Sequence, residues 1–305
     1  MSVINPTLIP YFEAAPSGPP STAIFAGNEA AINTHYDILS FSSLGNAAAG
    51  VSIGTGNYVC GLSSSGSRAV FGCIDYTTDY KYISFSSYGA ALNFGDMTTA
   101  VKNGAGCSDS TRGLYCGGQV SFASSRIDTI QYITIATASN ATVFGSLTST
   151  RAGCAGTQSE TKAFIVAGRT AANVQQKSIE YVTIQSLGNA VFWGNLSQSL
   201  NRPASLSDLN RAIIAGGYAA TTNTTKIEYF STASAGNSSN FGNIITARRD
   251  TTGCSNLTYG LIAGGTGANT LNDIEYITIS SLGNASAWGY LSTGRTELGS
   301  CTGTG

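Results

Sequence analysis

Histidine is nearly absent from this chain of 305 residues, which has His35 alone. A zinc site with three histidine ligands therefore cannot form, and any serine–histidine or cysteine–histidine nucleophile would have to use His35. Charged residues are scarce too, at 10% of the chain, against about 25% in a typical globular domain. With 15 Lys and Arg, 16 Asp and Glu and no basic cluster, the charge argues against nucleic acid or acidic membrane surfaces as partners.

Long apolar runs are missing as well. No stretch approaches the ~18 apolar residues of a membrane-spanning helix, so we expect no membrane insertion. The first twenty residues have neither a basic start nor a continuous apolar core, unlike a secretory signal. Seven cysteines include no CxxC pair and are odd in number, which favours reduced thiols over a disulfide scaffold. A content of 42% apolar residues at a net charge of −1 excludes wholesale disorder.

What the chain has is a repeat of about 48 residues. The frame IEYVTIQSLGNAVFWGNL, starting at Ile179, recurs as IEYITISSLGNASAWGYL, starting at Ile274, and four more divergent copies raise the count to six. The central tyrosines of the copies lie 46, 50, 49, 48 and 47 residues apart, at Tyr36, Tyr82, Tyr132, Tyr181, Tyr229 and Tyr276. A regular period of this length indicates one structural unit that is repeated.

Each copy contains four short runs that are typical of β-strands. A run of small residues around a Cys comes first, followed by an apolar run ending in Gly-Gly, the IEYITI run, and a run with an aromatic–Gly pair. β-branched and aromatic residues are frequent in these runs, Gly, Asn and Ser separate them, and no apolar stripe has helical spacing. Four strands per unit is typical of a β-propeller blade, so we expect an all-β, six-bladed β-propeller.

The order of these features resembles the kelch repeat. In the last copy the Gly-Gly pair, the Glu-Tyr pair, the aromatic, the Leu and the Arg are Gly264-Gly265, Glu275-Tyr276, Trp288, Leu291 and Arg295. The resemblance covers residues 21–305 and implies four-stranded, kelch-like blades. The first copy departs most, since Gly27-Asn28 replaces Gly-Gly and Ala49-Gly50 replaces the aromatic–Gly pair.

The two ends of the repeat region complement each other. The region begins with a second-strand sequence, Ser21–Asn28, that has no first strand before it, and it ends with a first-strand sequence, Gly299–Gly305. We expect the C-terminal strand to complete the N-terminal blade, because closure removes the two unpaired edges of an open ring. The expected domains are an extended, proline-rich arm at residues 1–20 and a closed propeller at residues 21–305.

Recurring cysteines are candidates for a soft-metal site. We predict equivalent places on the first strands for Cys60, Cys107, Cys154, Cys254 and Cys301. Thiolates gathered around a channel could bind a metal. However, Leu206 takes the sixth place, and ligands spread over six blades would stand too far apart for one ion. We favour packing of small side chains in a crowded inner strand, with Cys73 and Cys116 in the core of second strands.

Recurring carboxylates are candidates for acid–base chemistry. Three copies carry a Glu before the central tyrosine and an Arg after the fourth strand: Glu180 with Arg202, Glu228 with Arg248 and Glu275 with Arg295. A catalytic carboxylate pair would be unique in the chain, whereas these residues recur. We therefore expect a repeated structural ion pair within the blades, a pattern that Gln131 with Arg151 breaks. We expect no catalytic residue, no cofactor and no bound metal, and hence no enzyme.

Two segments are candidates for binding partners. Five of the six prolines lie in residues 1–20, interleaved with Leu8, Ile9, Tyr11 and Phe12. Such a segment is either a disordered tail or a docking arm whose apolar residues are buried in a partner. The loops between second and third strands, at residues 119–126, 169–177, 218–226 and 266–273, vary most and include Phe122, Arg169 and Tyr218. We expect this loop face to bind polar, glycan-like ligands through several weak contacts.

The consensus sequence of the repeat is IEYITIxxxGNAxxFGxL, followed by Arg, Gly-Cys and Ala-Gly-Gly. It is similar to kelch-like repeats in virion proteins of tailed phages. The resemblance implies a non-enzymatic structural protein of the virion, assembled in the host cytoplasm. Its propeller would be a decoration or host-surface-binding module on the capsid or tail. The arm would bind other virion proteins, and the loop face would bind a host-surface glycan or protein. The alternative is a cellular carbohydrate-binding or protein-scaffolding kelch-like propeller.

Overall fold

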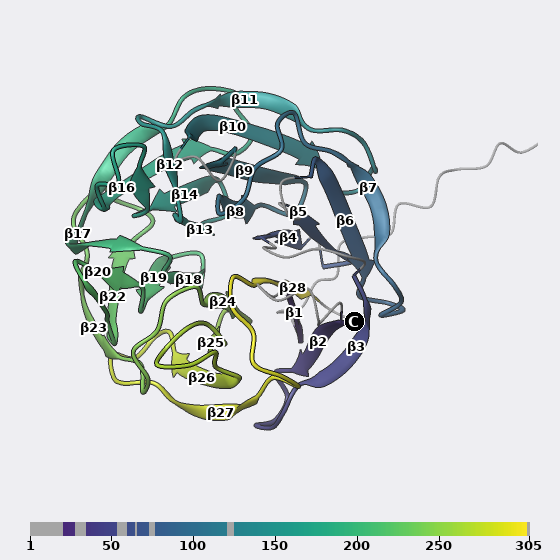
Figure 1. The fold of residues 1–305 in the computed structure, drawn as a ribbon, viewed down its shortest axis with the longest axis vertical. Coiled ribbons are helices and arrows are strands. Elements are labelled where there is room, and N and C mark those ends of the chain that lie inside the picture. The colour runs from purple at the N-terminus through teal and green to yellow at the C-terminus, as the bar shows by residue number, and fades with distance from the viewer. Residues whose placement is uncertain are drawn as a thin grey trace, which may run out of the picture.

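The computed structural model describes residues 21–27, 35–53, 60–64, 66–72, 77–120 and 125–303, with the backbone alone at residues 60–64. Across these ranges the regular elements are β-strands, and no helix is long and apolar enough to cross a membrane. Six sheets of at least four strands are arranged radially around a central axis (Figure 1). The predicted all-β, six-bladed β-propeller is therefore confirmed. The predicted arm, with Leu8, Ile9, Tyr11 and Phe12, lies outside the described residues.

In each blade four antiparallel strands follow one another from the innermost to the outermost. Blade 1 consists of β28 (Gly299–Gly303), β1 (Thr22–Ala26), β2 (His35–Ser40) and β3 (Ala48–Ser52). Blade 2 consists of β4 (Cys60–Ser64), β5 (Arg68–Gly72), β6 (Asp79–Ser84) and β7 (Leu92–Asp96). Blade 3 consists of β8 (Ala105–Ser108), β9 (Arg112–Gln119), β10 (Arg126–Thr134) and β11 (Thr142–Ser146).

The remaining three blades follow the same antiparallel order. Blade 4 consists of β13 (Ala155–Gln158), β14 (Lys162–Val166), β16 (Gln176–Thr183) and β17 (Val191–Asn201). Blade 5 consists of β18 (Ala204–Ser207), β19 (Arg211–Ala215), β22 (Lys226–Ser231) and β23 (Ser239–Asn243). Blade 6 consists of β24 (Thr252–Ser255), β25 (Tyr259–Ala263), β26 (Asp273–Thr278) and β27 (Ser286–Tyr290). Short strands in the loops are β12 (Arg151–Ala152), β15 (Arg169–Thr170), β20 (Tyr218–Ala219) and β21 (Thr222–Asn223).

The ring closes through the C-terminal strand, as predicted. β28 pairs with β1 in antiparallel register from Thr22 opposite Gly303 to Ala26 opposite Gly299. The backbone N–H of Ser21 extends this ladder with a hydrogen bond of 2.9 Å to the carbonyl of Gly303. Blade 1 is thus built from both ends of the described chain, and β1 is paired on both sides.

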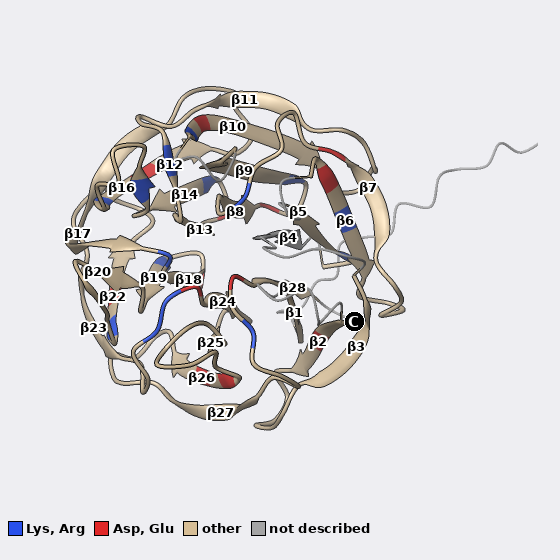
Figure 2. Ribbon diagram, in the orientation of Figure 1, with Lys and Arg blue, Asp and Glu red and all other residues tan. Residues whose placement is uncertain are grey.

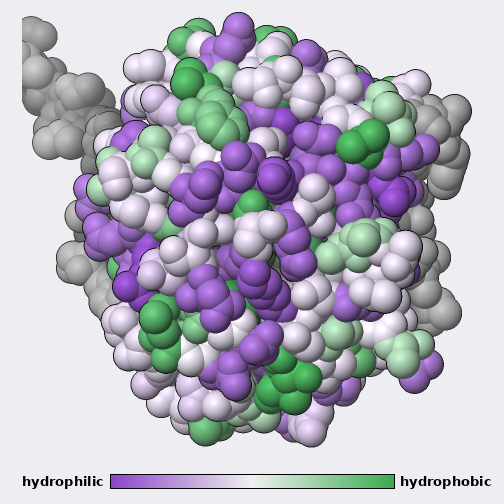
Figure 3. Space-filling model, turned by 90° about the vertical axis from the view of Figure 1, so that its left-hand side faces the viewer, coloured by the Kyte–Doolittle hydropathy of each residue, from purple (hydrophilic) through white to green (hydrophobic). Residues whose placement is uncertain are grey.

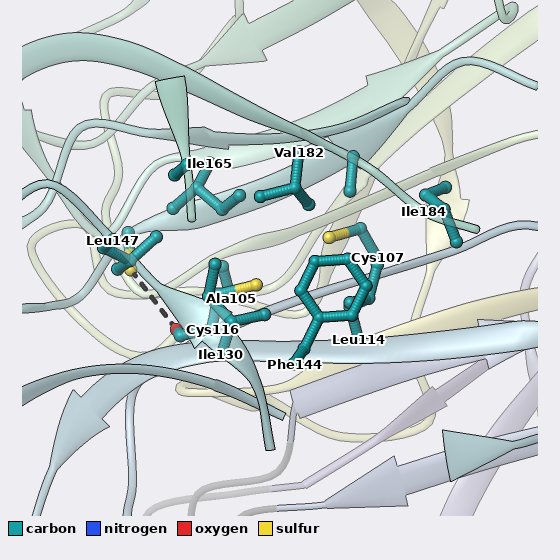
Figure 4. Packing of buried hydrophobic residues seen from close by; sticks show 13 residues of the cluster. Ala105, Cys107, Leu114, Cys116, Ile130, Phe144, Leu147, Ile165, Val182 and Ile184 are labelled. Atoms are coloured by element: carbon teal, nitrogen blue, oxygen red, sulfur yellow. Dashed lines mark hydrogen bonds between the residues drawn. The ribbon is translucent and has the colours of Figure 1, made fainter. Parts of the chain in front are cut away.

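The hydrophobic core lies between blades rather than within them. Six clusters of buried apolar side chains occur in the described residues, and each combines two neighbouring blades. In Figure 4, Leu114 and Phe144 of blade 3 pack with Ile165 and Val182 of blade 4. Second strands are buried on both faces because neighbouring blades cover them, which explains why they read as continuous apolar runs.

We call the contact between a blade and the next a seam. At each regular seam the glycine of an aromatic–Gly pair meets a Gly-Asn step of the next blade, or Ser139-Asn140 in blade 3. A Cβ at Gly194 would overlap the carbonyl oxygen of Gly236 in the next blade, so a side chain there does not fit. The following Asn237 accepts a hydrogen bond of 3.0 Å from the backbone N–H of Asn195. The same asparagine contact recurs at four other seams, through Asn46, Asn140, Asn189 and Asn284.

We expect Gly194→Ala to lower the free energy of unfolding by about 1–3 kcal/mol, because the new methyl group would push blades 4 and 5 apart. Urea denaturation of the full chain measures this change. The matched control is Gly188→Ala, since a Cβ at Gly188 would meet no atom within 4 Å. Equal stability of the two variants would contradict the close approach of strand and turn at this seam.

Candidate functional site

The inner strands surround a central cavity of about 640 Å³. Strands β8, β13, β18, β24 and β28 contribute most of its lining, which is dominated by Gly, Ala, Ser, Thr and Cys. Small residues occur there because six inner strands converge on one axis and leave little room for side chains. The cysteines that were predicted to share one place on the first strands would therefore line this cavity.

The predicted equivalence of the five cysteines holds for three of them. Cys107, Cys254 and Cys301 do share a place, opposite Leu114, Leu261 and Ile24 of their second strands, and Leu206 takes this place in blade 5. In blade 4 the place belongs to Thr157, opposite Phe164, while Cys154 precedes β13. In blade 2, Cys60 pairs with Gly72, which is also out of register.

The displaced cysteine of blade 4 has a physical cause. Gly153 has a φ of 67°, in the left-handed region that favours glycine, because it forms the turn before β13. Its Gly-Cys step therefore imitates the Gly106-Cys107 step of blade 3 from a position three residues earlier. A dipeptide match between copies does not fix the strand register.

The described cysteines are buried thiols that pack against their neighbours. A hydrogen bond with Cys107 and burial raise the pKa of the Cys116 thiol, and burial with the nearby Cys301 raises that of Cys254. The Cys154 Sγ donates a hydrogen bond of 3.9 Å to the Cys116 carbonyl (Figure 4). Within the part of the chain that the structure describes, no group of three His, Cys, Asp or Glu could hold a metal ion. These contacts support packing as the role of the cysteines.

The recurring carboxylates and arginines do pair, but across seams and not within blades. Arg151 of blade 3 binds Glu180 of blade 4, and Arg248 of blade 5 binds Glu275 of blade 6. Arg295 of blade 6 binds a carboxylate at the same place in blade 1, that of Asp37, with Nε at 3.1 Å. The expected pairing within a blade is therefore wrong. The apparent exception of Arg151 disappears, because its partner is in the next blade.

At two further seams both places are described and hold residues other than the arginine–carboxylate pair. In the seam from blade 4 to blade 5, Leu200 occupies the arginine place, and Lys226 Nζ lies 2.9 Å from the Glu228 carboxylate. In the seam from blade 2 to blade 3, Gln131 accepts a hydrogen bond of 2.8 Å from the backbone N–H of Thr98. The equivalent carboxylates also accept backbone N–H groups of the preceding blade, so they act as structural caps.

The central tyrosines of three copies lie under a cation at the start of the second strand. The guanidinium of Arg112 stands 4.5 Å from the ring centre of Tyr132 and donates a hydrogen bond of 2.8 Å to the Ile184 carbonyl of the next blade. Arg68 with Tyr82 and Arg211 with Tyr229 repeat this arrangement. These arginines join blades on the side opposite the loop face, and they were not among the residues predicted from the sequence.

At the loop-face end of the cavity, five equivalent residues form a ring of backbone hydrogen bonds. They have φ values from 52° to 67° and are Asn103, Gly153, Arg202, Asp250 and Glu297. From Gly153 onward, each donates its N–H to the carbonyl of the residue before it in this series, at 2.6, 2.7, 3.1 and 3.0 Å. The ring fixes the spacing of the blades around the mouth of the cavity.

Charged side chains gather at this mouth. Arg202 Nη1 lies 2.7 Å from the Asp250 carboxylate and 2.9 Å from that of Glu297. Arg249 Nε lies 3.2 Å from Asp250, and its guanidinium is 5.0 Å from the ring centre of Tyr218. Acidic and basic residues are otherwise interspersed around the propeller (Figure 2), and apolar side chains are scattered on the side that carries β17 (Figure 3).

The predicted binding residues of the loop face lie at equivalent places in neighbouring blades. Arg169 pairs with Ala152, and Tyr218 pairs with Asn201, each in the connection that follows the preceding blade. Both side chains are half-buried. Phe122 lies outside the described residues. Arg126 was not among the predicted residues, although its guanidinium reaches the loop of Arg169 by donating to the Thr170 carbonyl.

Comparisons with known proteins locate the fold and nothing finer. No family model matches the chain, and no curated protein matches its sequence. A solved structure titled "Structure of YjhT" is similar, with a TM-score of 0.69 and 10% sequence identity. The match covers 90% of this chain and 98% of that one. At this identity the likeness supports the propeller fold alone.

Proposed function

We propose that this chain is a non-enzymatic structural protein of a tailed-phage virion, with kelch-like blades. The propeller projects from the capsid or tail as a decoration or host-surface-binding module, and residues 1–20 anchor it to another virion protein. The similarity of the repeat's consensus sequence to kelch-like repeats of phage proteins supports this assignment. The observation that carries the proposal is that the recurring polar residues bind groups of neighbouring blades within the ring.

In five of the six blades this place holds a residue that caps a turn of the preceding blade, whereas blade 2 has Lys81 there. The five are Asp37, Gln131, Glu180, Glu228 and Glu275. Polar groups of the kind that enzymes use in catalysis thus hold blades together here, which suits a rigid display scaffold. The loop face adds Arg169 and Tyr218 on loops of differing sequence. Variable loops on a rigid ring are a common arrangement for recognition.

Immunogold electron microscopy of particles from the source lysate tests this proposal. An antibody against the propeller is expected to label the capsid or tail, and the chain is expected to sediment with the particles. A chain without residues 1–20 is expected to remain in the soluble fraction while melting like the full chain. If the full chain occurs only in the soluble cell fraction, the virion role is wrong and the cellular scaffold becomes the better assignment.

A further inference from the structure

We propose that Arg126 and Arg169 form an anion-binding site on the loop face, which takes a carboxylate or sulfate group of an acidic oligosaccharide. This inference rests on the proposed function, because it names the chemical class of the surface ligand. Two arginines that lie close together and have no carboxylate partner among the described residues carry the argument.

The two arginines belong to one small structure at the loop-face edge of blades 3 and 4. Arg169 begins β15, whose partner is β12 in the connection between these blades. Arg126 begins β10, donates from Nη1 to the Thr170 carbonyl and donates from Nη2 to the Asn173 Oδ1 at 2.9 Å. The Arg126 guanidinium therefore lies on the same turn that carries Arg169.

Positive charge at this place exceeds negative charge. Among the described residues, neither Arg126 nor Arg169 forms an ion pair, whereas Arg202 is bound by two carboxylates. Burial, followed by the positive charges of the nearby Arg169 and Arg202, lowers the pKa of Arg126. The Nε atoms of Arg126 and Arg169 are buried without a hydrogen-bond partner among the described residues. An anion bound at the partly exposed ends of these two side chains would offset the excess positive charge.

The third arginine connects this site to the cavity mouth. The Cγ of Arg202 lies 3.0 Å from the place that a Cβ on Gly153 would take, and Gly153 follows Ala152, the backbone partner of Arg169. Gly153 and Arg202 both line the central cavity. A ligand held at Arg169 can therefore extend along neutral and polar groups toward the mouth, which suits a chain of several sugars.

The chemistry of the ligand follows from the donors. Guanidinium groups bind planar carboxylates and sulfate oxygens through paired, charge-assisted hydrogen bonds. The Asn173 side-chain amide beside them suits hydroxyl groups of a neighbouring neutral sugar. A nucleic-acid backbone is a poorer fit, because its row of phosphates needs an extended basic surface, and this chain has a net charge of −1.

Isothermal titration of the full chain with three tetrasaccharides tests the site: tetragalacturonate, a sulfated galactan and the neutral galactan. We expect at least one acidic sugar to bind about tenfold more tightly than the neutral one, and Arg169→Gln to remove that preference. The acidic sugar that binds identifies carboxylate or sulfate as the anion. Arg169→Gln is expected to melt like the wild type, because Arg169 forms no ion pair among the described residues.

Lys177→Gln is the matched control, since it removes the same charge from an exposed position in β16. It is expected to change the affinity by less than about twofold. Equal binding of all three sugars by the wild type, or equal losses in Arg169→Gln and Lys177→Gln, would overturn the inference. Because the purified chain is titrated without particles, these results do not depend on the virion assignment, which the labelling experiment tests separately.

Discussion

A chain that ends at Leu298 is expected to lose its native fold. Removal of residues 299–305 takes away β28, the inner strand of blade 1, and leaves β1 with an unpaired edge. It also removes Cys301 from the core between blades 1 and 2, and the contacts of Ser300 with Thr252 and Gly253 in blade 6. The expected loss is of the order of a whole domain's stability, roughly 5–15 kcal/mol. Circular dichroism melting and size-exclusion chromatography measure it.

Two companion proteins make this experiment specific to closure. Removal of residues 304 and 305 alone is expected to leave the melting temperature unchanged, because β28 ends at Gly303. Moving residues 299–303 in front of Ser21 through a short turn is expected to restore folding, since every other blade joins its first and second strands that way. A chain ending at Leu298 that melts like the full-length protein would contradict closure through β28.

The repeat predicts the fold well because its signals are local in the sequence. Strand periodicity, the Gly-Gly pair and the central tyrosine lie within one copy, and six copies determine the number of blades. The closure strand could be identified for the same reason, since Gly299–Gly303 is a first strand that lacks its second strand. These features require no knowledge of which copies touch.

The pairing of side chains could not be predicted in the same way. An arginine after a fourth strand, such as Arg151, lies in the sequence between two carboxylate places, and only the geometry of the ring selects the later one, Glu180. The cysteine of blade 4 was misplaced because Gly153 serves a turn rather than a strand. Arg126 contacts a carbonyl 44 residues away, and no local pattern marks such a contact.

The same geometry predicts a large effect at the seam between blades 5 and 6. Arg248 and Glu275 are both almost fully buried, and Arg248 also donates hydrogen bonds to the carbonyls of Gly264 and Asp273. Arg248→Ala would leave the Glu275 charge buried without its partner. We expect a loss of about 3–5 kcal/mol in the free energy of unfolding, measured by urea denaturation. The neighbouring Arg249→Ala is the control. Arg249 is partly exposed and Asp250 keeps Arg202 as a second partner, so the expected loss is about 0–1 kcal/mol.

The seam between blades 2 and 3 has uncharged residues at the places of the ion pair. Between blades 2 and 3, Val101 stands at the place of Arg248 and Gln131 at the place of Glu275, and both are fully buried. Gln131 keeps the turn capped, because its Oε1 accepts hydrogen bonds from the Thr98 backbone and hydroxyl. The double variant Arg248→Val with Glu275→Gln copies this seam, so we expect it to recover most of the stability lost in Arg248→Ala. If the double variant is as unstable as Arg248→Ala, the seam requires the ion pair itself, and a neutral cap is not an equivalent solution.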